Sequence, residues 1–264
     1  MSLKRYILNH KTLSKIAWCL INNKNVLIQR VQNANELMKL KDLKNSNKCK
    51  RCFIIGTGPS LKIEDLEALK NEIVFAPNRI YELFEKTDWR PTYYLSQDHK
   101  LIQNFIDKIK TVEAEKIFLP IEFKNEFIGD KYNFFVLKEK NYYPKSAPFS
   151  KDISKYLAQG FTVTYGAIQI AAYMGFTEIY LLGIDHNYNI IRDAKGNVVR
   201  DKNAVNYADG IKDFKGNLPR IEETTIAYET AEKLSKKLGI KIYNCTRGGK
   251  LEAFERRNLE DVLN

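Results

Sequence analysis

The stretch Arg51–Leu61, RCFIIGTGPSL, decides the predicted fold of this chain. Its apolar residues 52–55 predict a buried strand, and a helix is expected from Ile63. Between them stands a glycine turn, made of Gly56, Thr57, Gly58, Pro59 and Ser60. Such a turn presents backbone N–H groups, and a helix N-terminus adds partial positive charge, so the two together attract phosphate. We interpret the glycines as points where the backbone approaches a ligand without a Cβ atom in the way.

The turn departs from the two best-known phosphate-binding motifs. The third glycine of G-x-G-x-x-G is missing, and no Gly-Lys-Ser/Thr follows as it would in a P-loop. Taken alone, the stretch is therefore also compatible with an ordinary strand-to-helix connection.

Strand and helix patterns alternate along the rest of the chain. Strands are expected at 52–55, 73–76, 91–96, 117–119, 134–137, 178–182 and 240–243, and helices at 63–70, 79–85, 99–110, 165–174 and 221–238. This alternation predicts an α/β fold, a Rossmann-like doubly wound, mostly parallel sheet with helices on both faces. Residues 187–219 are polar, rich in Gly and Asn and without periodicity, and a segment of that length inside a domain is typical of a lid.

The N-terminal fifth of the chain is strongly basic. Residues 1–50 contain 11 Lys and Arg against Glu36 and Asp42, so +9 of the total formal charge of +11 lies there. We expect a basic helical segment at 1–48, joined through a linker at 45–47 to an α/β domain at 49–264. Such a segment indicates an anionic partner such as lipid headgroups, a protein or nucleic acid, and a solvated appendage is the alternative. No apolar run approaches the roughly 18 residues that cross a bilayer, and no signal peptide is expected.

Polar or glycine-rich residues follow five of the predicted strands. In open parallel sheets, ligands bind beyond the carboxyl ends of the strands. The five stretches are Gly56–Ser60, Pro77-Asn78, Ser96-Gln97-Asp98-His99, Gly183-Ile184-Asp185-His186 and Asn244-Cys245-Thr246-Arg247. We therefore expect Asn78, Gln97, Asp98, Gly183 and Asp185 to take part in a nucleotide site.

Two further stretches carry candidate polar groups. Thr162 and Thr164 stand before the apolar helix at 165–174, where they either contact a phosphate or sugar or cap the helix. After strand 178–182, Asp185 is suited to bind ribose hydroxyls or to orient His186, and His186 is suited to act as a general base or to contact phosphate. An ordinary surface histidine is the alternative for His186.

Charged residues at the ends of the last helix and the last strand are the remaining candidates. Glu222 opens the helix at 221–238, where it either compensates the helix dipole or acts in catalysis beneath the lid. Arg220, Arg247 and Lys250 are candidate phosphate or acceptor contacts, and for the last two a charged C-terminal turn is the alternative. Asn206, Tyr207 and Asn217 of the lid are further candidates for substrate contact.

The cysteines indicate no metal site. Cys49 and Cys52 form a C-x-x-C, but zinc would need a second pair of ligands, and Cys19 and Cys245 are isolated. Four cysteines of this kind suggest reduced thiols in a cytoplasmic protein.

At this point the chain resembles a known family. The combination of FIIGTGPSL (53–61), FAPNRIYELFEKTDWRPTYYLSQD (75–98), GFTVTYGAIQIAAYMGFTEIYLLGIDHNY (160–188) and GIKIYNCTRGGKLEAF (239–254) is similar to the MptE-like family of bacterial carbohydrate-biosynthesis proteins. That family is named for an archaeal 6-hydroxymethylpterin diphosphokinase. It is distantly similar to bacterial sialyltransferases that use CMP-sialic acid, and to the central domain of motility-associated flagellin glycosyltransferases. The resemblance covers about residues 50–255 and leaves 1–48 out.

The resemblance implies metal-independent use of a nucleotide-activated sugar on a Rossmann-like domain with a lid. In the sialyltransferases the GxGPSL turn holds the CMP phosphate region, which maps to Gly56–Leu61 here. Their nucleotide contacts map to Asn78 and Thr162, and their GID motif to Gly183–Asp185. Their catalytic histidine at the start of the C-terminal helix is replaced near Glu222, so either this carboxylate or His186 is the base, or the reaction differs.

The sequence therefore predicts a glycosyltransferase, sialyltransferase-like, that uses a CMP-sugar in surface polysaccharide or glycoconjugate biosynthesis. Its expected partners are a nucleotide sugar and a glycan or lipid-linked acceptor, with no cofactor and no specific nucleic acid. We expect it in the cytoplasm, peripheral on the inner face of the membrane through its basic segment. The alternatives are a Mg²⁺-dependent diphosphokinase that acts on a pterin-like alcohol, with Asp98 and Asp185 as metal ligands, and a non-catalytic nucleotide-binding module.

Overall fold

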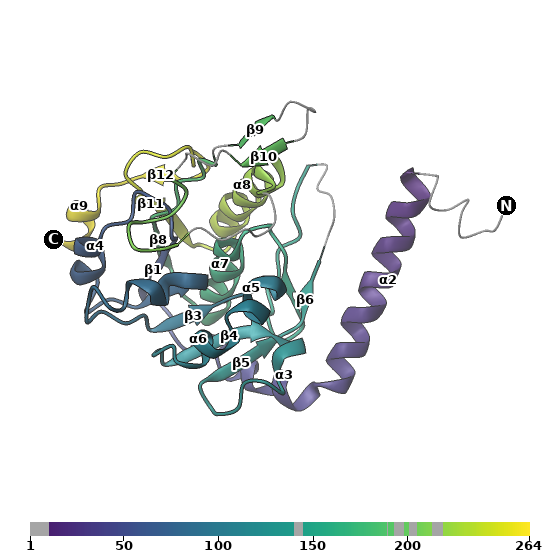
Figure 1. The fold of residues 1–264 in the computed structure, drawn as a ribbon. Coiled ribbons are helices and arrows are strands. Elements are labelled where there is room, and N and C mark those ends of the chain that lie inside the picture. Colours follow the sequence, from purple (N-terminus) through teal and green to yellow (C-terminus); the bar gives the residue numbers. More distant parts are fainter. Residues whose placement is uncertain (1–10, 140–144, 189, 193–197, 201–204, 213–218) are drawn as a thin grey trace.

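A single parallel sheet forms the centre of the protein (Figure 1). The structure, a computed structural model, describes residues 11–139, 145–188, 190–192, 198–200, 205–212 and 219–264. The eight-stranded sheet has the order β12-β11-β8-β1-β2-β3-β4-β5, and each neighbouring pair is parallel. The strands of this sheet are β1 (Arg51–Ile55), β2 (Val74–Pro77), β3 (Tyr93–Leu95), β4 (Lys116–Pro120), β5 (Tyr132–Phe135), β8 (Glu178–Leu182), β11 (Lys241–Asn244) and β12 (Glu255–Arg256).

Helices flank this sheet, and two small strand pairs lie beside it (Figure 1). The helices are α2 (Lys11–Gln32), α3 (Ala34–Lys41), α4 (Ile63–Ala68), α5 (His99–Asn104), α6 (Ile106–Lys110), α7 (Val163–Met174), α8 (Ile221–Lys237) and α9 (Leu259–Leu263), with 3-10 turns η1 (Asn78–Leu83) and η2 (Ile121–Phe123). Strands β6 (Leu137–Lys138) and β7 (Leu157–Ala158) pair in parallel, and β9 (Ile190–Arg192) and β10 (Val198–Arg200) form an antiparallel pair. The predicted α/β, Rossmann-like, doubly wound fold is confirmed.

The differences from the predicted elements are local. The helix expected at 99–110 is two helices, because the backbone leaves helical geometry at Phe105 (φ −127°, ψ 25°). The segment expected as a helix at 79–85 is the 3-10 turn η1. Strands β7 and β12 were not expected, since each has only two residues and no alternating pattern announces it.

The sheet changes winding direction between β1 and β8. From β1 the chain proceeds outward through β2, β3, β4 and β5, and it then returns to place β8 on the other side of β1. The loops that follow β1 and β8 therefore leave the same edge of the sheet in opposite directions. In doubly wound sheets this is the position where a crevice opens for ligands.

Helix α7 lies at the centre of the packing. Nearly all of its side chains are buried, and it ends at Gly175, whose φ of 89° lies in the left-handed region that glycine tolerates. Gln169 is fully buried and its amide bonds the backbone of Ser150, Ala158 and Tyr165. This side chain therefore fixes β7, and with it the chain that leads to Gln159, against the helix.

The N-terminal segment contributes to the core through its second half. Leu37, Leu40 and Leu43 are buried in the main hydrophobic core. The stretch 45–47, expected as a linker, is instead anchored, because the N–H groups of Asn45 and Asn47 donate to carbonyls at the end of α7 at 3.1 and 2.8 Å. Helix α2 runs along one side of the molecule toward the N-terminus (Figure 1). No helix in the described ranges combines the length and apolarity that a membrane span requires.

Candidate functional site

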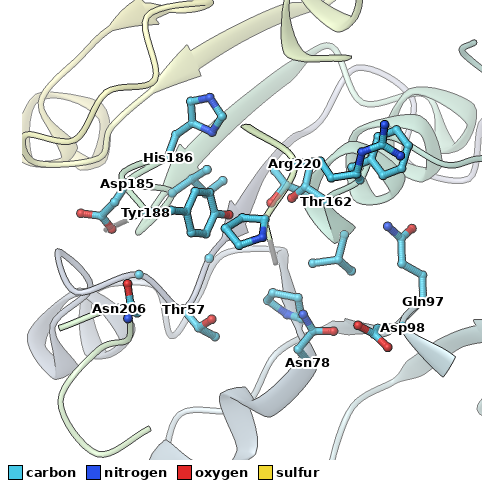
Figure 2. Close-up of a pocket in the computed structure, with 18 of the residues that line it drawn as sticks. Thr57, Asn78, Gln97, Asp98, Thr162, Asp185, His186, Tyr188, Asn206 and Arg220 are labelled. Atoms are coloured by element: carbon cyan, nitrogen blue, oxygen red, sulfur yellow. The ribbon is translucent and has the colours of Figure 1, made fainter. Parts of the chain in front are cut away.

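A cavity of about 770 Å³ lies beyond the carboxyl ends of β1, β2, β3 and β8, at the switch point (Figure 2). Its volume is in the range of sites for small molecules, about 300–1,000 Å³. It is lined by Gly56, Thr57, Gly58, Pro59, Pro77, Asn78, Gln97, Asp98, His99, Lys100, Leu137, Glu139, Gln159, Phe161, Thr162, Val163, Thr164, Gly183, Ile184, Asp185, His186, Asn187, Tyr188, Asn206, Tyr207, Pro219, Arg220 and Tyr228. Thus four of the five predicted strand-end stretches meet at one cavity.

The two glycines of the first turn allow two loops of the protein to touch. A Cβ atom on Gly56 would lie 2.4 Å from the carbonyl oxygen of Gly183, and one on Gly58 would lie 2.0 Å from Oδ2 of Asp185. The N–H groups of Gly56 and Gly58 donate to the carbonyls of Leu182 and Gly183 at 2.7 and 3.0 Å. The loop after β8 occupies the Cβ direction of both glycines, so this contact already requires glycine there. Both glycines also line the cavity, and the approach of a ligand to their backbone stays a prediction.

Asp185 holds the two loops together. Its Oδ2 accepts hydrogen bonds from the hydroxyl and the N–H of Ser60, at 2.8 and 3.3 Å. On the other side, the N–H of Lys250 donates to the Asp185 carbonyl at 2.7 Å. Ser60 therefore reaches the site through Asp185 and does not itself line the cavity. The carboxylate of Asp185 is therefore a structural hydrogen-bond acceptor, and Asp185 also lines the cavity.

His186 is held in a single orientation by α8. Its Nε2 lies 2.8 Å from Oγ1 of Thr225, and that hydroxyl donates its only proton to the carbonyl of Ile221 at 2.9 Å. Thr225 can therefore only accept from His186, so the geometry assigns the proton of the neutral imidazole to Nε2. Nδ1 is then an acceptor; it is buried and has no hydrogen-bond partner in the described structure. Burial lowers the pKa of the His186 imidazole below its usual value.

The backbone of His186 also has an unusual conformation. Its φ of 48° is in the left-handed region, which non-glycine residues seldom adopt. The ring packs edge-on against Tyr228 and Tyr188, with centroid distances of 5.5 and 6.2 Å. Strained backbone of this kind gathers at functional sites when the surrounding packing supports it.

Asn78 presents its amide to the cavity from the end of β2. Its backbone is left-handed (φ 51°), and its carbonyl accepts from the hydroxyl of Tyr94 at 2.6 Å. Its Oδ1 accepts from the hydroxyl of Ser96 at 3.1 Å, which assigns the other amide atom, the donor Nδ2, to the cavity side. Next to it, the buried Oε1 of Gln97 has no hydrogen-bond partner in the described structure. Both side chains are thus placed to recognise a polar ligand (Figure 2).

Asp98 and Thr162 stand at two helix N-termini. Asp98 caps α5, because its Oδ1 accepts from the N–H of Leu101 at 3.1 Å. Thr162 occupies the N-cap position of α7 but makes no capping hydrogen bond, and its hydroxyl lies 3.4 Å from that of Tyr228. The capping alternative is therefore not observed for Thr162, and the N-terminus of α7 opens toward the cavity with Thr162, Val163 and Thr164 in its lining.

A cation stands at the rim of the cavity above α7. The guanidinium of Arg220 lies 4.2 Å from the ring centroid of Phe161, and it also pairs with Glu223. Phe161 has a left-handed backbone (φ 57°), which turns its ring toward Arg220. Arg220, as expected, therefore lines the cavity and brings positive charge to it (Figure 2).

Besides Ser60, three predicted residues are not brought to the cavity. Glu222 is exposed on the first turn of α8, and Lys250 is exposed beyond β11. Arg247 forms a two-pronged ion pair with the buried carboxylate of Asp65, at 2.7 and 2.8 Å, and also contacts Glu260. The physical reason is that the stretch 246–250 packs behind the loop of Asp185 and faces α4, away from the cavity.

The segment 187–219, which we expect to be a lid, contributes described residues to the cavity wall. Asn206 and Tyr207 line the cavity, and the N–H of Ala208 donates to the carbonyl of Thr57 at 3.0 Å. Lys86 pairs with Asp209 at 2.7 Å, which anchors this stretch to the chain after η1. Asn217 lies outside the described residues.

Among the residues of the site that the sequence did not predict are Thr225, Tyr228 and Phe161. Thr225 and Tyr228 lie on α8 one helical turn apart, and their amphipathic pattern is that of any helix that packs on a core. The sequence predicts no role for Phe161, which precedes α7. Its positive φ is the feature that orients it, and an aromatic residue gives no sign of that in a sequence.

The cysteines are free thiols. Cys52 is buried in β1 and Cys49 is exposed, so the C-x-x-C does not form a paired site. Among the described residues there is no group of three or more His, Cys, Asp or Glu side chains arranged to hold a metal ion.

The fold is that of a Rossmann-like α/β protein with a cavity at the switch point of its sheet. The chain belongs to the family described as 6-hydroxymethylpterin diphosphokinase MptE-like, whose model matches residues 28–190. The match thus begins inside α2, and it includes the loops after β1, β2, β3 and β8. A search of curated proteins finds no significant relative.

Solved structures share the fold at low sequence identity. The MAf glycosyltransferase from Magnetospirillum magneticum AMB-1 has a TM-score of 0.50 and 14% identity over 84% of this chain. This chain spans only 37% of the length of that enzyme. The sialyltransferase CstII from Campylobacter jejuni, in complex with cytidine-5'-monophosphate, has a TM-score of 0.44 and 20% identity over 80% of this chain and 85% of its own. At 14% identity, the likeness to the MAf enzyme shows the fold alone.

Proposed function

We propose that this protein is a glycosyltransferase that uses a nucleotide-activated sugar, with a CMP-sugar favoured, in surface polysaccharide or glycoconjugate biosynthesis. The observation that carries the proposal is the cavity at the switch point. Its volume suits a small molecule, and its wall combines a helix N-terminus, a cation and several hydrogen-bonding side chains without an apolar majority of residues. The wall also carries the carboxylates of Asp98, Glu139 and Asp185. It therefore favours a polar ligand whose phosphate lies near Arg220 and the N-terminus of α7, as that of a nucleotide sugar would.

Two further features support this choice of substrate class. The fold is shared with the MAf glycosyltransferase, and this likeness supports the proposal of a glycosyltransferase. The sequence of the strand-end loops resembles that of sialyltransferases that use CMP-sialic acid, and this resemblance is the reason for favouring CMP over other nucleotides.

We assign roles in substrate binding to six of the cavity residues. Asn78, Gln97 and Thr162 hold the nucleotide through hydrogen bonds, Thr57 and Thr164 complete its surroundings, and Arg220 with the N-terminus of α7 stabilises the departing phosphate. These groups are fixed before the substrate binds, so they stabilise charge in the transition state without reorganisation.

His186 is the proposed general base. Its Nδ1 is an acceptor that lacks a donor in the described structure. Because this atom is buried, the cavity lining must shift when substrate binds before an acceptor hydroxyl can donate to it. In the transfer, Nδ1 removes the hydroxyl proton while the hydroxyl oxygen attacks the anomeric carbon. The bond between that carbon and the nucleotide phosphate oxygen breaks, and the nucleotide leaves with the electron pair. Glu222, the rival base, does not line the cavity.

The proposed acceptor is a glycan or a lipid-linked glycan, and the proposed location is the cytoplasm at the inner face of the cell membrane. Activated nucleotides and lipid-linked acceptors meet there. The basic N-terminal segment supports this location through its charge.

A diphosphokinase is the second candidate function, favoured by the description of the family whose model matches the chain. It would transfer diphosphate from ATP to a pterin-like alcohol. Asp98 and Asp185 are the carboxylates at the cavity that would hold Mg²⁺, and each already accepts a hydrogen bond from the protein. Because no larger ligand cluster exists among the described residues, the ion would have to arrive with the phosphates of the substrate.

Thermal shift with CMP, CDP, UDP, GDP and ADP, followed by calorimetry with the best ligand, tests the proposal. We expect CMP to raise the melting temperature most, Asn78→Ala to weaken CMP binding by about tenfold for a lost hydrogen bond, and Glu222→Gln to leave it unchanged. Hydrolysis or transfer of a CMP-sugar without added metal would support the transferase. ATP turnover that requires Mg²⁺ would favour the diphosphokinase, and nucleotide binding with no turnover of any donor would favour the non-catalytic module.

A further inference from the structure

Helix α2 carries two different faces. One face packs on the body of the protein: Val26 is buried, the amide of Asn22 donates to the carbonyl of Glu139, and Nε2 of Gln29 donates to Glu122 at 2.9 Å. The other face is exposed and apolar, made of Leu20, Ile21, Leu27, Ile28 and Val31, which we call the apolar stripe. Leu20 is 65% exposed and Val31 72% exposed, so the described structure gives this stripe no partner.

The spacing of the stripe is that of one helix face. Positions 20, 24, 27, 28 and 31 follow the i, i+4, i+7, i+8, i+11 pattern, and 21 lies beside them. The member at position 24 is Lys24, which is exposed and stands in the middle of the stripe. Any partner of this face must therefore accept apolar side chains and an ammonium group together.

The charge of the helix selects between the possible partners. Helix α2 contains Lys11, Lys15, Lys24 and Arg30 and no acidic residue. In a symmetric dimer the same face meets itself, so Lys24 would be buried against a helix that has no carboxylate to pair with it. At an anionic bilayer the leucine, isoleucine and valine side chains enter the acyl boundary, and the ammonium reaches back to lipid phosphates.

We propose that the apolar stripe of α2, together with Lys24, is a docking surface for an anionic lipid bilayer. The helix would lie in the plane of the interface, with its other face holding the body of the protein. This surface is specified independently of the transferase proposal, since it requires no substrate.

The surface is close to the cavity. Glu139, which bonds Asn22, lines the cavity, and Glu122, which bonds Gln29, also pairs with the cavity residue His99 at 3.5 Å. A helix with its side chains is about 10–12 Å across. A bilayer bound to the apolar stripe would therefore lie about one helix diameter from the cavity rim, within reach of a membrane-borne acceptor.

Sedimentation of the full chain with vesicles tests this surface. We expect the protein to sediment with vesicles of equimolar phosphatidylglycerol and phosphatidylcholine, and much less with phosphatidylcholine alone or at high salt. The double variant Leu27→Asp/Val31→Asp should lose at least about tenfold in bound fraction, and Lys24→Glu a smaller factor. Ile128→Asp is the matched control, because Ile128 is an 88% exposed isoleucine outside the stripe, between η2 and β5, and this variant should bind as the wild type does.

Two results would overturn the proposal. One is that wild-type protein stays in the supernatant or that the double variant sediments equally well. The other is that light scattering without vesicles finds a dimer that Leu27→Asp/Val31→Asp dissociates, which would assign the stripe to a second copy. Vesicle binding is measured without nucleotide or acceptor, so its failure leaves the proposed catalytic function intact, and a failed activity assay leaves the docking surface intact.

Discussion

A Cβ atom added to Gly58 would lie 2.0 Å from Oδ2 of Asp185, a residue 127 positions later in the chain. The two loops at the switch point are therefore built against each other, and glycine is required by the contact between them. This makes Gly58 a probe of the architecture of the site. A loss of ligand binding on its substitution would not by itself identify a phosphate contact.

We predict that Gly58→Ala destabilises the fold by about 1–3 kcal/mol, the usual cost of forcing an atom into a packed position. The cost should be smaller in the background of Asp185→Ala, because the nearest clashing atom is then absent. Chemical denaturation of the four proteins of this cycle measures the coupling. Strictly additive free energies of unfolding would contradict the contact.

We predict that Thr225 positions the imidazole of His186. In Thr225→Val the hydrogen-bond acceptor for Nε2–H is lost, so the two neutral tautomers should mix and the transfer rate should fall by about tenfold, a loss typical of a misplaced catalytic base. Nucleotide affinity should change little. Nitrogen NMR of the histidine ring reads the tautomer directly, and Thr225→Ser should restore both the tautomer and the rate. An unchanged tautomer in Thr225→Val would contradict the assignment.

Stability should depend on pH through His186. Burial lowers its pKa in the folded state, so the unfolded chain binds more protons as the pH falls below about 6.5. The contribution of His186 to the free energy of unfolding is therefore complete above that pH and is lost on acidification, until the pH passes below the folded pKa. His186→Gln should reduce this acid sensitivity in thermal unfolding.

The pKa of His99 is shifted in the opposite direction to that of His186, so His99 supplies a control. Its hydrogen bond with Glu122 raises its pKa, so its stabilising contribution is present at low pH and is lost as the pH rises through the folded value. His99→Gln should remove that second dependence and leave the acid sensitivity caused by His186. If His186→Gln and His99→Gln shift the pH profile in the same direction, one of the two assignments is wrong.

Arg247 should act on stability and not on binding. Its guanidinium pairs with Asp65, whose side chain is only 3% exposed, so Arg247→Ala leaves a buried carboxylate without its cation and should cost about 1–3 kcal/mol. Lys250→Ala, an exposed neighbour, should cost almost nothing. Denaturation measures both costs. The CMP affinity of each variant, measured below its melting transition, should be unchanged. A large loss of CMP affinity in Arg247→Ala with unchanged stability would contradict this prediction and indicate that Arg247 takes part in binding.

Local patterns in the sequence were enough to predict much of the fold and part of the site. The strand at 178–182 matches β8 residue for residue, and the strand at 52–55 lies within β1, because a buried parallel strand is a short apolar run bounded by turn residues. Asn78 and Gln97 line the cavity as expected, since the carboxyl ends of parallel strands share one edge of the sheet. These inferences need only neighbouring residues and one general rule of topology.

What the tertiary structure alone decided is which side chains meet across long separations in the chain. Arg247 pairs with Asp65 and not with the cavity, Thr225 orients His186, and the space beside Gly58 belongs to Asp185. The amino-acid types at these positions are compatible with either a ligand or a protein partner, because an arginine or a carboxylate has the same chemistry toward both. Only the packing of the loops against one another determines which partner comes within hydrogen-bond distance.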